Sequence, residues 1–269
     1  MKINGVYYHV DKIGDGSHHV LMLHGFTGNG RNFHDLIAEL ENADDFTFIL
    51  IDLLGHGKTE APGDTKRYSM ENTITDLRTI LERLEISKIS IYGYSLGGRV
   101  ALSFAVASPM LVRKLVLESA SPGLEIMEDR LARIKSDEKL AEQIEKEGLK
   151  SFVDFWTDIP LFQSQKKLSV SKQEAIYQQR LNNSSVGLAN SLRGIGTGVQ
   201  PSNWELLDKM DCPVLLAAGE QDEKFVLIAQ EMRKMIKKSL FFKISDAGHA
   251  IHVEQPRKFG KIVSEFLSN

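Results

Sequence analysis

The chain has 269 residues, 42% of them hydrophobic and 26% charged, a composition that is ordinary for a globular protein. Its formal net charge of -3 gives no reason to expect a nucleic-acid partner, and no apolar segment approaches the length that spans a membrane. A single cysteine, Cys212, excludes an internal disulfide and fits a reducing compartment. Because the N-terminus also lacks an apolar leader, we expect a cytoplasmic protein, either a monomer or a small homo-oligomer.

The first part of the chain alternates short apolar runs with helical patterns. Residues 2–10 predict a first strand, and four continuous apolar runs predict strands buried on both faces of a parallel sheet, at 20–23, 46–50, 89–92 and 115–117. Helices are expected between these runs, at 33–40, 69–84 and 98–105. Strands that alternate with helices indicate crossover units and therefore a mostly parallel sheet.

The pattern changes between residues 119 and 203, which are rich in charge and helix formers and contain no buried-strand run. We interpret this segment as a helical cap inserted over the sheet. Strands resume at 213–218 and 240–244, and a last helix is expected at 256–267. The sequence therefore predicts an α/β core of residues 1–118 and 204–269, with helices on both faces of its sheet, and a helical cap of residues 119–203.

Residues 93–97, with the sequence GYSLG, carry the most informative motif. A strand, a Gly-x-Ser-x-Gly pentapeptide and a helix in that order are typical of a nucleophile elbow, which holds a serine on a sharp turn with its Oγ exposed. Gly93 and Gly97 leave room for the strained backbone at Ser95 and for the neighbouring chain. Ser95 is thus the candidate nucleophile or base.

A serine hydroxyl becomes reactive when an imidazole takes its proton, and that imidazole needs a carboxylate to fix its tautomer. Asp222 follows one predicted strand and His249 follows the next, so both are expected at the edge where parallel sheets bind ligands. We therefore predict that Ser95, Asp222 and His249 form a catalytic triad. Glu220 and Asp246 are the rival acids.

The other histidines receive structural interpretations. His24 and His56 lie in glycine-bounded loops, which we expect them to order. His249 and His252 could suggest a paired metal site, but no third ligand is evident, so we expect neither a metal nor a cofactor. Cys212 stands beside Pro213 at the start of an apolar run and is expected to be a small buried hydrophobe.

Two backbone N–H groups are expected to form an oxyanion hole, those of Leu96, directly after the serine, and of Phe26, in the loop after an earlier strand. Arg99 lies one helical turn after Ser95, near a helix N-terminus, where a cation opposes the helix dipole. Such a charge beside a nucleophile suggests a bound anion. The alternative is an arginine whose stem covers apolar surface while its head pairs with an acid.

With these residues assembled, the chain resembles the α/β-hydrolase superfamily over essentially its full length, including the order of serine, aspartate and histidine. More narrowly, it resembles the synthases of menaquinone biosynthesis that make 2-succinyl-6-hydroxy-2,4-cyclohexadiene-1-carboxylate. The resemblance rests on HGFTG at 24–28, GYSLGGRVAL at 93–102, SPGL at 121–124 with EDRLAR at 128–133, GEQDEKF at 219–225 and AGH at 247–249. The arginine after the elbow and the SPGL to EDRLAR stretch are its most particular parts.

The resemblance implies an elimination, in which a base removes a ring proton and pyruvate departs from an enolpyruvyl ether. Ser95, activated by His249 and Asp222, would then act as the base, and no acyl-enzyme would form.

The resemblance also implies a small-molecule polycarboxylate substrate that is held by arginines. Arg99 matches the elbow arginine, Arg133 a cap-helix arginine and Arg180 an arginine before an Asn-rich turn. Tyr94 and Trp156 match aromatic residues near the substrate. The match around Arg180 is loose because residues 163–179 make a longer segment than the family pattern, and a solvated surface arginine is the alternative there.

Two other functions remain open from the residues. One is a serine hydrolase on the same scaffold, cleaving an ester, thioester or carbon-carbon bond of an acidic substrate. The other is a ligand sensor that keeps the fold and the triad but turns over slowly.

Overall fold

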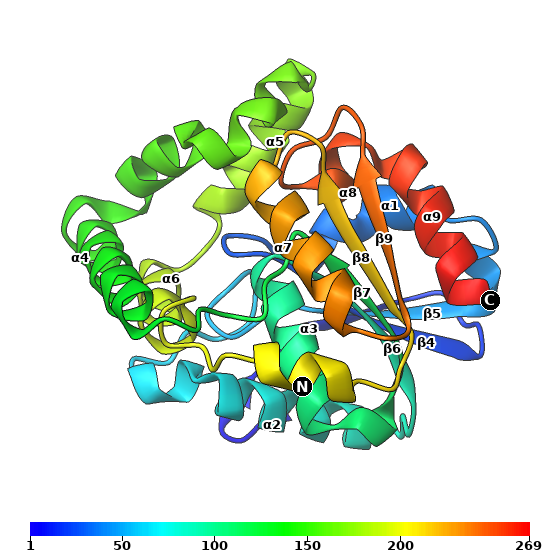
Figure 1. The fold of residues 1–269 in the computed structure, drawn as a ribbon. Helices are drawn as coiled ribbons and strands as arrows, with labels where there is room; N and C mark the ends of the chain where they lie inside the picture. Colours follow the sequence, from blue (N-terminus) through cyan, green and yellow to red (C-terminus); the bar gives the residue numbers. More distant parts are fainter.

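The computed structural model describes all residues 1–269 and places seven strands in one twisted sheet (Figure 1). Their order across the sheet is β3 (Val10–Ile13), β5 (Phe46–Ile51), β4 (His18–Leu23), β6 (Ile89–Tyr94), β7 (Val112–Glu118), β8 (Val214–Gly219) and β9 (Ser239–Ile244). Only β3 runs antiparallel to its neighbour, and all the other pairs are parallel. The predicted mostly parallel sheet is thereby confirmed.

The central strands are buried along their whole length. Every residue of β5, β6 and β8 is buried, as expected for strands that carry helices on both sides. Their continuous apolar runs are therefore a direct consequence of their position in the sheet.

Helices cover both faces of the sheet (Figure 1). On one face, α2 (Met70–Arg83), α3 (Leu96–Ala107) and α7 (Glu223–Met235) pack against one apolar core. On the other face, α1 (His34–Ala38), α8 (Ile251–Glu254) and α9 (Pro256–Ser268) build a second core. This three-layer arrangement is the predicted α/β fold class.

The segment between β7 and β8 is helical and stands apart from the sheet at its ligand-binding edge (Figure 1). It contains α4 (Met127–Asp158), α5 (Val170–Leu181) and α6 (Ser185–Ile195), with the 3-10 helix η5 (Pro160–Lys167) between α4 and α5. The backbone of α4 breaks at Gly148, where φ is +84°. These elements share a small apolar cluster of their own, and the cap boundaries at 119 and 203 stay a prediction.

Three local predictions were wrong in detail. The expected strand at 2–10 is a hairpin of β1 (Lys2–Ile3) and β2 (Val6–Tyr7), because Asn4 and Gly5 both take positive φ and turn the chain. The helix expected at 33–40 starts as the 3-10 helix η1 (Gly30–Phe33) and continues as the short α1. The other 3-10 helices are η2 (Ala43–Asp45), η3 (Thr65–Tyr68), η4 (Pro109–Leu111) and η6 (Trp204–Lys209). Cys212 is half-buried beside the core, not fully buried.

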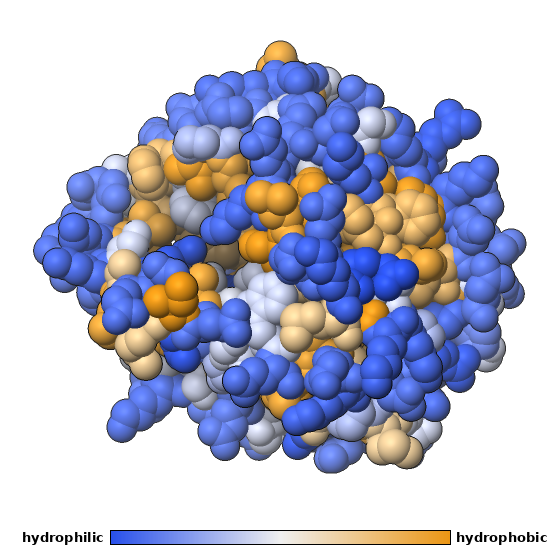
Figure 2. Space-filling model, viewed as in Figure 1, coloured by the Kyte–Doolittle hydropathy of each residue, from blue (hydrophilic) through white to orange (hydrophobic).

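Charged and polar residues dominate the face seen in Figure 2, which is hollowed between α4 and α7. Apolar and polar side chains both border this hollow. No helix is both long and apolar enough to cross a membrane.

Candidate active site

Ser95 sits at the turn between β6 and α3 with φ 51° and ψ -108°, a backbone conformation that is strained for a residue with a side chain. The turn can close only around small residues. A Cβ on Gly97 would lie 1.9 Å from the carbonyl oxygen of Leu23, and one on Gly93 would lie 2.4 Å from the carbonyl oxygen of Gly97. The two glycines therefore allow the backbone contact that presents the Ser95 hydroxyl to the pocket.

The structure brings Ser95, His249 and Asp222 together. His249 Nε2 lies 2.9 Å from Ser95 Oγ, and His249 Nδ1 lies 2.6 Å from Asp222 Oδ2. Because the Asp222 carboxylate accepts the proton on Nδ1, Nε2 is free to accept the Ser95 hydroxyl proton. The rival acids lie elsewhere: Glu220 faces Lys243 at 3.7 Å, and the exposed Asp246 faces Lys258 at 3.5 Å.

Phe26 and Leu96 both line the pocket in front of Ser95. Leu96 is the first residue of α3, where helical N–H groups have no partner within the helix. The N–H of Phe26 likewise donates no hydrogen bond to another backbone group. Both donors are thus available to an oxygen of a bound molecule, as the predicted oxyanion hole requires.

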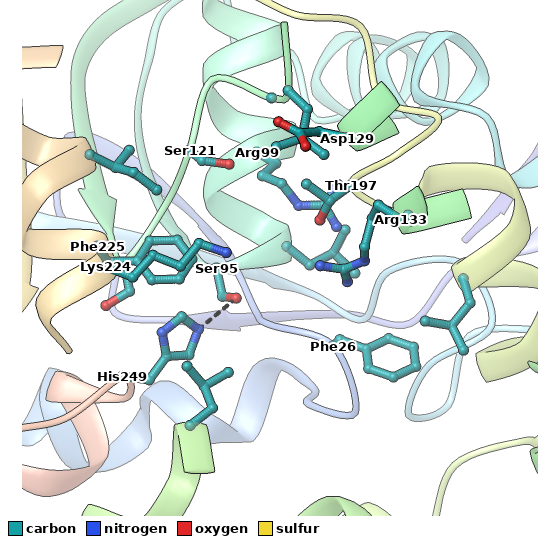
Figure 3. Close-up of a pocket in the computed structure, with 18 of the residues that line it drawn as sticks. Phe26, Ser95, Arg99, Ser121, Asp129, Arg133, Thr197, Lys224, Phe225 and His249 are labelled. Carbon is teal, nitrogen blue, oxygen red and sulfur yellow. Dashed lines mark hydrogen bonds between the residues drawn. The ribbon is translucent and has the colours of Figure 1, made fainter. Parts of the chain in front are cut away.

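The pocket has a volume of about 400 Å³ and lies between the sheet edge and the cap. Ser95 and His249 line it, and Arg133 reaches it from α4 (Figure 3). Trp156, also from α4, is a further lining residue. Trp156 stacks on Phe152 with ring centroids 5.5 Å apart. A volume of this size accommodates a substituted six-membered ring.

Arg99 reaches this pocket from α3 and Arg133 from α4 (Figure 3). Arg99 donates to the carbonyl oxygen of Ile195 at 2.7 Å and to Gln200 Oε1 at 2.8 Å, so its hydrogen-bonding partners are neutral. Burial, followed by repulsion from Arg133, lowers the pKa of Arg99 to about 9. Arg133 Nε donates to Asp137 Oδ1 at 2.8 Å. Glu125 and Asp129 also line the pocket, so the two guanidinium groups face a cavity that contains carboxylates as well.

Arg180 and Tyr94 do not line this pocket. They line a neighbouring cavity of about 40 Å³ behind the glycine-rich loop that contains Gly25 and Phe26. Arg180 is only 5% exposed, which contradicts the alternative of a solvated surface arginine. The Tyr94 ring packs between His249 and His252, with centroids 5.4 and 4.6 Å away.

Lys224 and Phe225 line the pocket, although neither was predicted as a site residue from the sequence. The ring of Phe225 packs 4.7 Å from the ring of His249. Lys224 is the second residue of α7, where a cation opposes the helix dipole. The same signal that singled out Arg99 could have identified Lys224.

The remaining histidines are tied into the fold. His24 Nδ1 contacts the Gly25 carbonyl oxygen at 2.8 Å and His56 Nδ1 contacts the Leu54 carbonyl oxygen at 3.0 Å, as expected for residues that order loops. His252 Nδ1 lies 2.9 Å from the fully buried Glu118, away from any shared ligand position with His249. No group of three or more metal-ligating side chains occurs in the structure.

The fold and the site together define a serine-dependent enzyme of the α/β-hydrolase type. Residues 18–256 match the family model described as alpha/beta hydrolase fold. A Bacillus subtilis (strain 168) protein that carries the provisional name 2-succinyl-6-hydroxy-2,4-cyclohexadiene-1-carboxylate synthase is 48% identical, over 99% of this chain and 96% of its own. A Citrobacter koseri protein of the same name, without that qualification, is 33% identical over 90% of both chains.

A solved structure titled "Structure of MenH from S. aureus" superposes with a TM-score of 0.92 at 37% identity, covering 97% of this chain and 98% of the other. An esterase from Exiguobacterium antarcticum superposes with a TM-score of 0.83 at 21% identity, which shows only the shared fold. The chain belongs to the α/β-hydrolase fold family and, within it, to the 2-succinyl-6-hydroxy-2,4-cyclohexadiene-1-carboxylate synthases.

Proposed function

We propose that the protein is a carbon-oxygen lyase of menaquinone biosynthesis that eliminates pyruvate from 2-succinyl-5-enolpyruvyl-6-hydroxy-3-cyclohexene-1-carboxylate. The product is 2-succinyl-6-hydroxy-2,4-cyclohexadiene-1-carboxylate, the diene. The observation that carries the proposal is the pairing of a complete serine triad with two arginines in one pocket, Arg99 from the core helix α3 and Arg133 from the cap. The family membership supports the same reaction.

The triad supplies a base at the position where the reaction needs one. His249 takes the proton of Ser95 Oγ, to which it is 2.9 Å away, and Ser95 then removes the hydrogen on ring carbon 2. The released electron pair forms the bond between carbons 2 and 3, the old double bond moves to carbons 4 and 5, and the bond from carbon 5 to oxygen breaks. The proton on His249 is available to the departing enolate, which becomes pyruvate.

Negative charge develops on the ketone oxygen of the succinyl group when carbon 2 loses its proton. The N–H groups of Phe26 and Leu96 lie unpaired at the pocket and would bind that oxygen. Fixed donors in a site that excludes water stabilise such an oxyanion strongly, because they need no reorganisation as the charge forms.

Arg99 and Arg133 select a substrate with several carboxylates. Each charge-assisted hydrogen bond to a carboxylate contributes about 1.5 to 3 kcal/mol, so two arginines could dominate recognition. A neutral ester would offer no carboxylate to Arg99, whose hydrogen-bond acceptors within the chain are both neutral. The arginines therefore favour the polycarboxylate lyase over an esterase of neutral substrates.

The test is to incubate the purified protein with the enolpyruvyl substrate, freshly generated by the enzyme that makes it. Pyruvate and the absorbance of the conjugated diene should appear at equal rates, well above those of the spontaneous reaction. A folded protein that gives no acceleration would contradict the lyase and favour the acidic-substrate hydrolase, or the ligand sensor if it binds tightly without turnover.

A second measurement examines the role of Ser95. We expect the intact mass of the protein to stay unchanged during turnover, because a base forms no covalent bond to the substrate. An adduct that forms and decays at the turnover rate would instead identify a nucleophilic serine. A cytoplasmic location and a monomeric or small homo-oligomeric state stay predictions.

A further inference from the structure

Lys224 is the cation of the active-site pocket to which the proposed function has given no role. It lines the pocket with Ser95 and His249, and its side chain is directed into the cavity (Figure 3). Unlike Lys243, which faces Glu220, Lys224 forms no ion pair within the chain. Its ammonium group lies 5.7 Å from the centre of the Phe225 ring, a weak contact at an exposed site. The ammonium is therefore free to bind an anion in the cavity.

The cations of the pocket stand on two sides of the serine. In Figure 3, Arg99 and Arg133 lie on the same side of Ser95 as Phe26, whereas Lys224 lies on the other side with His249. The two sides also differ in exposure, because Arg99 is partly buried and donates hydrogen bonds to Ile195 and Gln200 of the cap, whereas Lys224 is exposed. The side of Arg99 is thus suited to retain an anionic group, and the side of Lys224 is suited to release one.

The proposed substrate has acidic groups that diverge in the same way. The succinyl chain is on ring carbon 2 and the enolpyruvyl ether on carbon 5, so the two arms leave the six-membered ring from opposite corners. If Ser95 removes the hydrogen on carbon 2 and the N–H of Phe26 binds the succinyl ketone oxygen, the succinyl arm extends toward Arg99 and Arg133. The enolpyruvyl arm then extends toward the opposite wall, where Lys224 is the available cation.

We propose that Lys224 binds the carboxylate of the enolpyruvyl group and holds the leaving pyruvate. This inference rests on the proposed function and names the residue that recognises its leaving group. The bond from carbon 5 to oxygen breaks with its electron pair on the departing oxygen, while Lys224 keeps its proton and acts only as the counter-ion of the carboxylate. A flexible ammonium group at an exposed position can follow the product as it leaves.

The experiment compares how the two products inhibit the enzyme, with diene absorbance as the readout when pyruvate is added and pyruvate release as the readout when the diene is added. Lys224→Gln should raise the inhibition constant of pyruvate about five- to tenfold and leave that of the diene within twofold. Arg99→Met should show the opposite pattern, since the diene keeps the succinyl and ring carboxylates. Lys224→Arg should retain pyruvate inhibition close to that of the unchanged protein.

Lys234→Gln is the matched control, because Lys234 is in the last turn of the same helix and pairs with Glu231 at 2.6 Å. It should change neither inhibition constant. An unchanged pyruvate constant in Lys224→Gln would overturn the assignment, as would an equal rise in both constants, which would show only a general electrostatic effect. A wild-type protein that releases no pyruvate would overturn the proposed function and this assignment together, an outcome seen before any variant is made.

Discussion

His24 holds the peptide group whose N–H belongs to Phe26. The N–H of Leu53 donates to His24 Nε2 at 2.9 Å, so the ring proton is on Nδ1, which donates to the carbonyl oxygen of Gly25 at 2.8 Å. The N–H of Gly28 donates to the same oxygen at 2.9 Å. The C=O and N–H groups of a trans peptide point in opposite directions. The two hydrogen bonds to the Gly25 carbonyl oxygen therefore orient the Phe26 N–H toward the opposite side, away from His24 and Gly28. That N–H is one of the two proposed oxyanion donors.

His24→Ala should therefore lower kcat about tenfold and change KM less than twofold, since the donor matters most when charge develops on the ketone oxygen. His24→Asn should retain most of the activity, because its amide N–H can take the place of Nδ1. Steady-state rates of diene formation measure both variants, with circular dichroism as the check on folding. Equal kcat values in His24→Ala and the unchanged protein would mean that the loop holds its shape without the imidazole.

Ser95 and Asp222 should act as one unit with His249. Asp222→Asn should lower kcat by about three to four orders of magnitude, because an asparagine can donate to Nδ1 and so favour the wrong tautomer of His249. Ser95→Ala should lower kcat at least as much. Residues that work together give non-additive losses, so the double variant should be no slower than the slower single variant. If the loss of kcat in the double variant equalled the product of the two single losses, the two residues would act independently.

Stability should fall on mild acidification because of two buried histidines. Burial lowers the pKa of His24 to about 4 and that of His56 to about 3, whereas both titrate near 6.5 in the unfolded chain. On acidification the unfolded state therefore binds protons that the folded state does not bind. The contribution of the two histidines to the free energy of unfolding is complete above pH 6.5 and decreases as the pH falls toward the folded pKa values.

Between pH 7 and pH 5 each histidine should reduce the free energy of unfolding by about 2 kcal/mol. Urea denaturation at the two pH values measures the loss. His56→Gln should remove about half of it, since glutamine does not titrate. The same pH dependence in His56→Gln would assign the loss to other groups.

The parts of the fold that the sequence predicted are those with a local signal. The buried strands follow from continuous apolar runs, and the elbow at Ser95 from its pentapeptide and flanking elements. The hairpin at Asn4 and Gly5 also had a signal, because this dipeptide favours a two-residue turn, but the alternation from 2 to 10 concealed it. At this hairpin one local pattern thus masked the other.

No local pattern in the sequence indicates in which direction a side chain of the site points. Tyr94 and Ser95 are neighbours in sequence, yet one faces the small cavity behind the loop and the other the main pocket. Arg180 reaches that small cavity because the packing of α5 against α4 and η5 turns it inward. These placements depend on contacts between distant segments, which a single sequence does not reveal.

Arg180 carries a charge that is buried without a carboxylate partner. It donates to Thr157 Oγ1 at 2.9 Å and to Gln165 Oε1 at 3.3 Å, and its guanidinium lies 4.5 Å from the centre of the Phe162 ring. Burial lowers the pKa of Arg180 to about 10, which reflects the cost of keeping the charge there. The cavity it lines is bounded by the loop of Phe26, so its positive potential acts behind the proposed oxyanion hole.

We predict that Arg180→Met raises the free energy of unfolding by about 1 kcal/mol, because it removes a charge that is costly to bury. The same variant should lower kcat/KM, because the charge of Arg180 is then missing where the enolate oxygen develops. Arg193→Met is the matched control, since Arg193 is a cap arginine that pairs with Glu138 and Glu145. This control variant should be less stable than the unchanged protein. Urea denaturation and diene formation measure the two effects. A destabilised Arg180→Met would show that the neutral partners and the Phe162 ring compensate the charge, and an unchanged kcat/KM would leave Arg180 a purely structural residue of the cap.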